Sequence, residues 1–228
     1  MKLIFFILIL FTSVLKSQIS INYTIKKTEG TNKHILNINI VNHTKIKYLI
    51  PIDTTGFRVY YPEEPCSNFY YELSADKGLG LMLLFKYNEE YVMGDSKSNH
   101  LKDIDLDVMT SSKLDEINNK ILKKWKKKWG FKSDLSAKKN MYLYESLLSL
   151  KPNESISFIK EIDFSEFNNT DIFYNTYSLE NGKVYGFSLS HCIDENIYLN
   201  LTSQQRKKFK NYTFFNGTIY SKETEVKQ

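Results

Sequence analysis

Apolar side chains recur at every second position along much of this chain. In the segment 19–25 apolar residues alternate with polar ones, and the same pattern returns at 36–40 and 46–52. A period of two matches the pleat of a β-strand, and one polar face indicates an antiparallel strand that is half buried. An amphipathic helix would need a period near 3.6 residues, so the chain is predicted to be mainly β.

Further strands are expected beyond this group, separated by turn sequences. They are predicted at 57–61, 79–87, 147–150, 155–164, 173–179, 184–189, 197–201 and 212–220. Asn181-Gly182 is typical of a two-residue hairpin turn, which would pair the strands on either side of it. Pro152 followed by Asn153 fits a type I turn. Short strands at this spacing favour a sandwich or barrel, and we expect one antiparallel β-sandwich domain over 18–228.

One segment breaks the β pattern. Apolar residues recur at helical spacing at Leu114, Ile117, Ile121, Trp125 and Trp129. Ser112 is a candidate N-cap, and Gly130 can end the helix. We therefore predict an inserted amphipathic helix at about 112–130 and a shorter helix near 203–209.

The first seventeen residues have the composition of an export signal. Lys2 precedes an unbroken apolar run from Leu3 to Phe11, which Thr12 to Leu15 extend, and Ser17 is a small residue before a polar one. This order is typical of a signal peptide, and the run is shorter than the ~20 residues that cross a bilayer as a helix. We expect residues 1–17 to be removed and the rest to be secreted or periplasmic. No cysteine lies near the cut and no later run reaches spanning length, so neither a lipid anchor nor a transmembrane helix is expected.

Export would decide the chemistry of the two cysteines. Cys66 and Cys192 would meet an oxidising compartment, where a disulfide between them can form. The alternative is two buried thiols that pack as small apolar groups. Sequence alone does not show whether their Cα atoms come close enough to bond.

The predicted helix is strongly basic. Its segment 113–129 contains seven lysines and two acids. Lysines together with tryptophan are typical of a helix that lies on a membrane surface. The alternative is that the apolar stripe packs on the sandwich and the lysines form its solvated face. The candidate surface-binding residues are Lys120, Lys123, Lys124, Lys127, Trp125 and Trp129.

An acidic segment precedes the helix. Asp103, Asp105 and Asp107 alternate with apolar residues and offer the oxygen ligands that Ca²⁺ prefers. A helix–loop–helix calcium site, however, needs Gly where Val108 stands and Glu where Leu114 stands. The favoured interpretation is an extended segment with a polar face.

Motifs for enzymatic chemistry are missing from the sequence. It contains no zinc-ligand spacing, phosphate-binding glycine loop or serine-nucleophile motif. We expect no metal, no cofactor and no catalytic residues. The alternative is a hydrolase-like enzyme whose site assembles from distant strands. Its candidate residues are His34, His43, His100, His191, Asp194 and Glu195.

The numbers and kinds of charged residues limit the class of binding partner. The chain has 31 basic and 26 acidic residues, and only Arg58 and Arg206 are arginines. Because arginine is the usual reader of phosphates and guanine edges, this argues against nucleic acid. We expect a non-catalytic binding or interaction module of the cell envelope or exterior, with a protein or a glycan as partner. The alternative partner is an anionic membrane surface, bound through the helix at 113–129.

Two local patterns resemble exported bacterial proteins of immunoglobulin-like β-sandwich architecture. One is Leu36-x-Ile38-x-Ile40-x-Asn42-x-Thr44 followed by Tyr48–Pro51, and the other is Leu150-x-Pro152-Asn153-Glu154-Ser155-x-x-Phe158. The Cys…Trp…Cys spacing of true immunoglobulin domains is absent, because both tryptophans fall in the predicted helix. The resemblance implies an architecture and supplies no activity or site residues.

Overall fold

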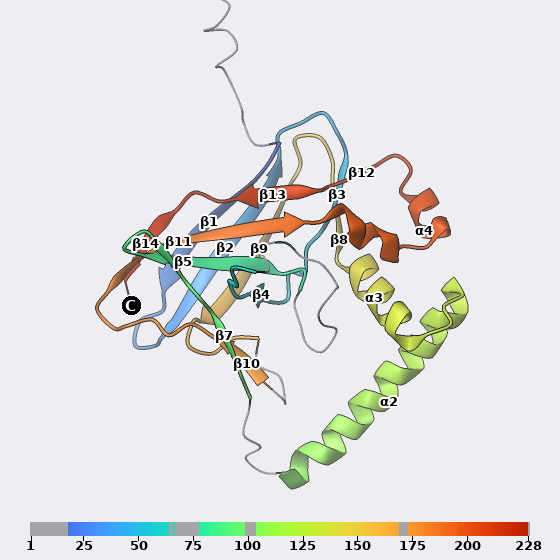
Figure 1. Cartoon of the computed structure of the whole chain (residues 1–228), viewed down its shortest axis with the longest axis horizontal. Helices are drawn as coiled ribbons and strands as arrows, with labels where there is room; N and C mark the ends of the chain where they lie inside the picture. Colours follow the sequence, from blue (N-terminus) through green and yellow to red (C-terminus); the bar gives the residue numbers. More distant parts are fainter. Residues whose placement is uncertain (1–17, 64–65, 67–77, 99–103, 169–172, 228) are drawn as a thin grey trace, which may run out of the picture.

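Strands dominate the molecule, and nearly all of them pair antiparallel. The prediction of a mainly β chain is therefore confirmed. Figure 1 shows the strands gathered on one side, with helices α2, α3 and α4 on the other. The structure is a computed structural model that describes residues 18–63, 66, 78–98, 104–168 and 173–227.

The elements follow one another along the chain in a fixed order. The strands are β1 (Ile19–Lys27), β2 (Lys33–Asn42), β3 (Tyr48–Pro51), β4 (Phe57–Arg58), β5 (Leu81–Tyr87), β6 (Glu90–Val92), β7 (Asp95–Ser98), β8 (Leu147–Leu150), β9 (Ser155–Asp163), β10 (Phe173–Thr176), β11 (Val184–Ile193), β12 (Thr213–Phe214), β13 (Gly217–Tyr220) and β14 (Thr224–Lys227). The helices are α2 (Ile104–Trp129), α3 (Asp134–Glu145), the 3₁₀ helix η1 (Glu195–Asn200) and α4 (Ser203–Lys208).

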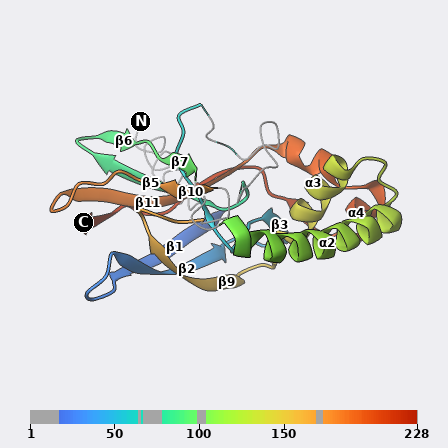
Figure 2. The same cartoon turned by 90° about the horizontal axis from the view of Figure 1, so that it is seen from below.

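Two sheets face each other across the core. Strands β1, β2 and β9 form one antiparallel sheet, and β13, β11, β5 and β4 form the main path of the other. The inward residues of the first sheet are the alternating apolar positions found in the sequence, such as Ile38 and Ile40. They share one buried cluster with Leu83 and Phe187 of the second sheet. Figures 1 and 2 show the two layers stacked.

Aromatic rings fill the middle of this core. The ring of Phe85 lies 4.8 Å from that of Phe164 and 4.9 Å from that of Phe187, measured between centroids. Tyr23 joins the two sheets, because its ring meets Phe187 edge-on and its hydroxyl donates to the Phe187 carbonyl at 2.6 Å. Buried aromatic pairs of this kind stabilise the fold beyond their buried area.

A smaller sheet connects the core to the helices. It consists of β12, β3 and β8, with β12 parallel to β3. Asn42 fixes its edge: the side chain is fully buried and its amide donates to the carbonyls of Ile46, Leu150 and Lys151 at 2.7–3.2 Å. The loop after β2 and the turn after β8 are therefore held against each other.

Two predicted turns differ from the structure. Asn153 has a φ of +57°, whereas a type I turn has a negative φ at that position, so the predicted turn type is wrong. Gly182 does turn the chain, with a φ of +81°. The predicted hairpin around it is wrong, because β10 pairs with β7 while β11 pairs with β5, β13 and β14.

Three helical segments also differ from expectation. Helix α2 begins at Ile104 rather than near 112, so the segment predicted to be extended is helical where it is described. Asp105 and Asp107 fall in its first turn. Helix α3 was not predicted, and the predicted strand at 197–201 is instead the helix η1. The predicted short helix near 203–209 is confirmed as α4.

The structure joins Cys66 to Cys192 in a disulfide with a Cα–Cα distance of 4.4 Å. The bond ties a position between β4 and β5 to the end of β11, over a sequence separation of 126 residues. Over the described part of the chain, no helix combines the length and apolar character needed to cross a bilayer.

Candidate functional site

Three helices and η1 are held together by one buried side chain. The Asn140 amide, on α3, donates to the carbonyl of Asn200 and to Oε1 of Gln205, both at 2.7 Å. Its Oδ1 accepts from Nε1 of Trp125 at 2.8 Å and from Nε2 of Gln205 at 3.0 Å. Asn140 and Gln205 are fully buried. Because every polar atom of this amide pair is satisfied, the network fixes α2, α3, η1 and α4 relative to one another.

Local capping explains why two of these helices begin where they do. Ser133 caps α3 by accepting from the backbone N–H of Ser136 at 3.0 Å. Thr202 and Gln205 form a reciprocal capping box at the start of α4, with distances of 3.2 and 2.8 Å. Gln205 therefore serves both the cap and the buried network. This double role places α4 against α3.

The two tryptophans of α2 are half-buried against the neighbouring helices. The Trp125 ring lies 5.5 Å from Tyr144 of α3, and the Trp129 ring lies 5.9 Å from it. Tyr144 continues the cluster to Phe209, at 5.7 Å. The Trp side of α2 thus packs on α3 and the end of α4, rather than on the sandwich as the alternative interpretation expected.

Lysines border this aromatic cluster. The Lys128 ammonium lies 5.2 Å and the Lys208 ammonium 5.0 Å from the centre of the Trp129 ring. At these distances a cation is attracted to the face of the ring. Lys128 and Lys208 come from different helices, so the packing of α2 beside α4 joins their basic residues into one surface.

Charge is concentrated on these helices. We use the name basic arm for residues 116–145 of α2 and α3 together with residues 203–210 of α4. The arm carries three acids, namely Glu116, Asp134 and Glu145. It carries thirteen basic residues, namely Lys120, Lys123, Lys124, Lys126, Lys127, Lys128, Lys132, Lys138, Lys139, Arg206, Lys207, Lys208 and Lys210.

The described residues outside the helices α2, α3 and α4 lack this bias. The described residues outside 104–145 and 203–210, which we call the β body, hold 13 basic and 15 acidic residues. The arm therefore has a formal charge of +10 beside a nearly neutral body, while residues 104–115 of α2, which are counted in neither part, hold three acids and one lysine. All four predicted surface-binding lysines lie on the arm and are exposed.

The acids of the arm are partly engaged by lysines. Glu116 pairs with Lys120 at 2.7 Å, one turn along α2. Asp134 pairs with Lys126, and this contact holds the pKa of the Asp134 carboxyl below its usual value. Burial raises the pKa of Glu145. Most of the positive charge on the arm has no acidic counterpart within the arm, so the arm presents a positive potential to solvent.

The residues considered for an enzyme are spread over the fold. His34 and His43 lie near opposite ends of β2, and His191 lies in β11 of the other sheet. His100 is outside the described residues. Asp194 caps η1 by accepting from the Asn196 N–H at 2.8 Å, and the next residue, Glu195, is exposed. The described members of this set are therefore not brought together.

Two of these histidines belong to the core. His191 is buried, and its Nε2 donates to the carbonyl of Pro51 at 2.9 Å, because a carbonyl can only accept. Burial, with a smaller contribution from Arg58, lowers the pKa of His191 to about 3. His34 packs its ring 4.8 Å from Phe164, and burial lowers its pKa as well. Both are neutral near pH 7 and act as packing residues.

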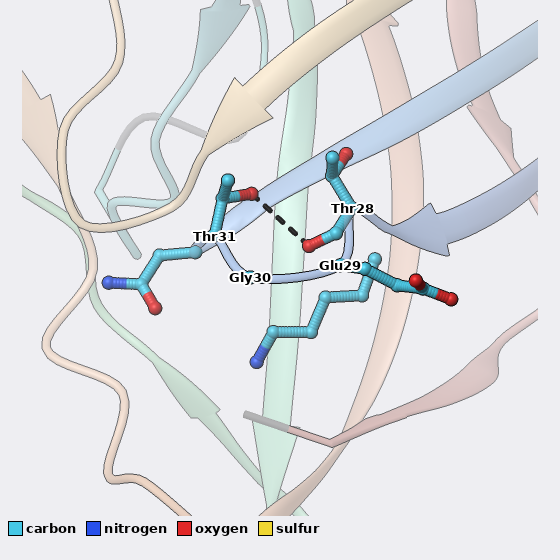
Figure 3. Close-up of a pocket in the computed structure, with 6 residues that line it drawn as sticks. Thr28, Glu29, Gly30 and Thr31 are labelled. Atoms are coloured by element: carbon cyan, nitrogen blue, oxygen red, sulfur yellow. Dashed lines mark hydrogen bonds between the residues drawn. The ribbon is translucent and has the colours of Figure 1, made fainter.

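A surface pocket of about 410 Å³ lies at the tip of the hairpin between β1 and β2. Its lining comes from a single turn, residues 27–32. Figure 3 shows the Thr31 hydroxyl donating to the Thr28 carbonyl, at 3.2 Å, and the Glu29 side chain extending away. No second element supplies a catalytic partner here, so we place the candidate site on the basic arm.

Metal ligands do not converge in the described part of the structure. Among those residues, no group of three His, Cys, Asp or Glu side chains could hold a metal ion. Of the acidic segment considered for Ca²⁺, Asp103 lies outside the described residues. Asp105 and Asp107 lie in α2, where a spacing of two residues does not define one face.

The lysines of α2 are visible in the sequence, whereas the residues that organise the arm are not. Asn140 and Gln205 are 65 positions apart, and no spacing rule connects them. The start of α3 did carry a signal, namely Ser133 followed by Asp134, which is typical of a capped helix. Comparison with family models, with curated proteins and with solved structures found no match, so similarity assigns no family to this chain.

Proposed function

We propose that this chain is an exported, non-catalytic binding module whose basic arm recognises an anionic partner. One observation carries the proposal. The arm holds thirteen basic and three acidic residues, whereas the β body holds 13 basic and 15 acidic residues. A cluster of one sign attracts opposite charge and speeds association with it. The body then serves as a rigid support.

The chemistry of lysine is consistent with such a partner. Twelve of the thirteen basic residues of the arm are lysines. Lysine is a compact, strongly hydrated point charge, whereas arginine forms planar paired hydrogen bonds to single carboxylates or phosphates. A lysine-rich surface therefore suits an extended anionic surface better than one precisely placed anion.

We also propose that the two facing sheets form a sandwich of the immunoglobulin-like class and that residues 1–17 direct export. The two stacked sheets, whose pairs are all antiparallel except β4 with β5, support the first proposal. The disulfide between Cys66 and Cys192 supports the second, because such bonds persist in oxidising compartments. Sequencing the N-terminus of the protein recovered outside the cytoplasm tests export: the expected first residue is Gln18, and recovery of uncleaved protein in the cytoplasm would contradict it.

Binding to soluble polyanions tests the function of the arm. Heparin and polyglutamate are titrated against the protein, with the fluorescence of Trp125 and Trp129 as readout. The change Lys124→Gln with Lys127→Gln should weaken binding by about tenfold and lower its salt dependence. The matched control is Lys45→Gln with Lys47→Gln, which removes two exposed lysines from the β body. Equal losses in both variants, or no binding at low salt, would refute the proposal.

A further inference from the structure

The outer side of α2 combines lysines with exposed isoleucines. Ile117 and Ile121 are 54% and 46% exposed, although most large apolar side chains among the described residues are at least partly buried. Lys120, Lys124 and Lys128 lie three, seven and eleven positions after Ile117, so all five project from one side of the helix. We call these five residues the Ile–Lys face.

The side of α2 opposite this face is already occupied. Leu122 is 5% exposed, and Lys126 pairs with Asp134 of α3. Trp125, four positions after Ile121, lies between that side and the Ile–Lys face and donates its indole N–H to Asn140 of α3. These contacts fix the rotation of α2 about its axis. The Ile–Lys face therefore points away from α3, and Figures 1 and 2 show α2 on the outer side of the helical group.

The positive surface continues beyond the end of α2. Lys128, the last member of the Ile–Lys face, shares the Trp129 ring with Lys208 of α4. Three further exposed cations lie close to Lys208 in the sequence: Arg206 and Lys207 within α4, and Lys210 just after it. A partner that lies along the Ile–Lys face would thus meet further cations at its C-terminal end.

We propose that the Ile–Lys face lies on an anionic lipid surface, an inference that rests on the proposed function of the basic arm. Charge complementarity favours an anionic partner on this face. The two isoleucines indicate whether that partner is a soluble polyanion or a lipid surface. A soluble polyanion offers no apolar region to cover Ile117 and Ile121. A bilayer offers anionic headgroups to the lysines and the boundary of the acyl chains to the isoleucines.

Sedimentation with vesicles tests this inference. The purified protein should bind vesicles of phosphatidylglycerol and phosphatidylcholine at low salt, and should not bind vesicles of phosphatidylcholine alone. Ile117→Ser with Ile121→Ser should weaken binding by about tenfold, because two partly inserted side chains are lost. Lys120→Gln with Lys124→Gln should weaken it by about fivefold for each lysine. The matched control is Ile159→Ser, since Ile159 is 67% exposed on β9 of the body.

The two polyanion probes separate this inference from the proposed function. The Ile117→Ser and Ile121→Ser variant should keep its affinity for heparin, because its charge is unchanged. If the protein binds heparin or polyglutamate but not anionic vesicles, the lipid inference is wrong and the function of the arm stands. If it binds vesicles and the two serines have no effect, the Ile–Lys face is not the contact. If it binds none of the probes, both proposals fail.

Discussion

The β body and the basic arm are stabilised by different chemistry. The body encloses apolar side chains from two sheets, with Phe85 fully buried between other rings. The arm depends on one amide network around Asn140 and on half-buried rings bordered by lysines. A body of the first kind tolerates many surface changes, whereas an arm of the second kind depends on a few polar contacts. Under the proposed function, the stability of the fold would rest on the β body and binding on the basic arm.

The largest expected effect is in the β body. Replacing Cys66→Ser together with Cys192→Ser opens a loop of more than a hundred residues and should lower the free energy of unfolding by about 5 kcal/mol in the chain-entropy model. Denaturant unfolding of the native and variant proteins measures the difference. Both tryptophans lie in the arm, so their emission in the folded variant should match that of the native protein. A loss below about 1 kcal/mol would show that the bond adds little to the body.

Acid should weaken the body through its buried histidines. The pKa of His191 is about 3 in the folded state and near 6.5 when unfolded, so the unfolded chain binds more protons below about pH 6.5. Stability is therefore full above that pH and falls as the pH drops towards 3. From pH 7 to pH 4.5 the loss should be about 2–3 kcal/mol for His191, with a further loss from His34.

Urea unfolding at the two pH values measures this loss. His191→Gln should make the free energy of unfolding depend less on pH. The glutamine amide can still donate to the Pro51 carbonyl, but it does not titrate in this range. His43→Gln, which changes an exposed ring, is the control. A dependence unchanged in His191→Gln would show that other groups cause the acid sensitivity.

A smaller effect is expected in the arm. Asn140→Ala leaves the Trp125 indole N–H and the Gln205 amide without their buried partner, which should cost about 2 kcal/mol. In denaturant unfolding, the transition followed by tryptophan emission should move to a lower denaturant concentration. The transition followed by the near-ultraviolet circular dichroism of the tyrosines in the β body should keep its midpoint. Asn119→Ala, an exposed change on α2, is the control. A single shared transition would mean that arm and body unfold as one unit.

The smallest effect concerns a single ion pair of the arm. Lys126→Gln removes the partner of Asp134, and the pKa of that carboxyl should rise towards its usual value. Thermal melting should hardly change, because exposed ion pairs add little to stability. Nuclear magnetic resonance titration of the Asp134 side chain measures the first effect. A clear drop in the melting temperature would show that this pair secures α3 to α2.

Sequence periodicity predicted the parts of the fold in which local pattern and tertiary contact agree. Strands β1, β2 and β9 follow the alternation of apolar residues because one face of their sheet covers the core. Helix α3 was not predicted from this periodicity. There the cap at Ser133 and the burial of Ala137 and Leu143 favour a helix.

The remaining differences arise from pairing between distant segments. The turn at Gly182 forms as its sequence indicates, but β10 and β11 find other partners, because hydrogen-bond partners of a strand are chosen by the whole sheet. The lysines of the candidate site were visible in the sequence. The side of α2 that they occupy was not, because Asn140 and Gln205 set the rotation of the helix.

Asn42 has a consequence for producing the protein. With Thr44 it forms the Asn-x-Thr triplet to which eukaryotic secretory cells attach oligosaccharides. In the folded molecule its amide nitrogen is fully enclosed and shared among three carbonyls. A sugar transferred to the nascent chain at this position would block the closure of β2 against the turn after β8. Material made in yeast or insect cells should therefore misfold in proportion to occupancy at Asn42, whereas bacterial expression avoids the conflict.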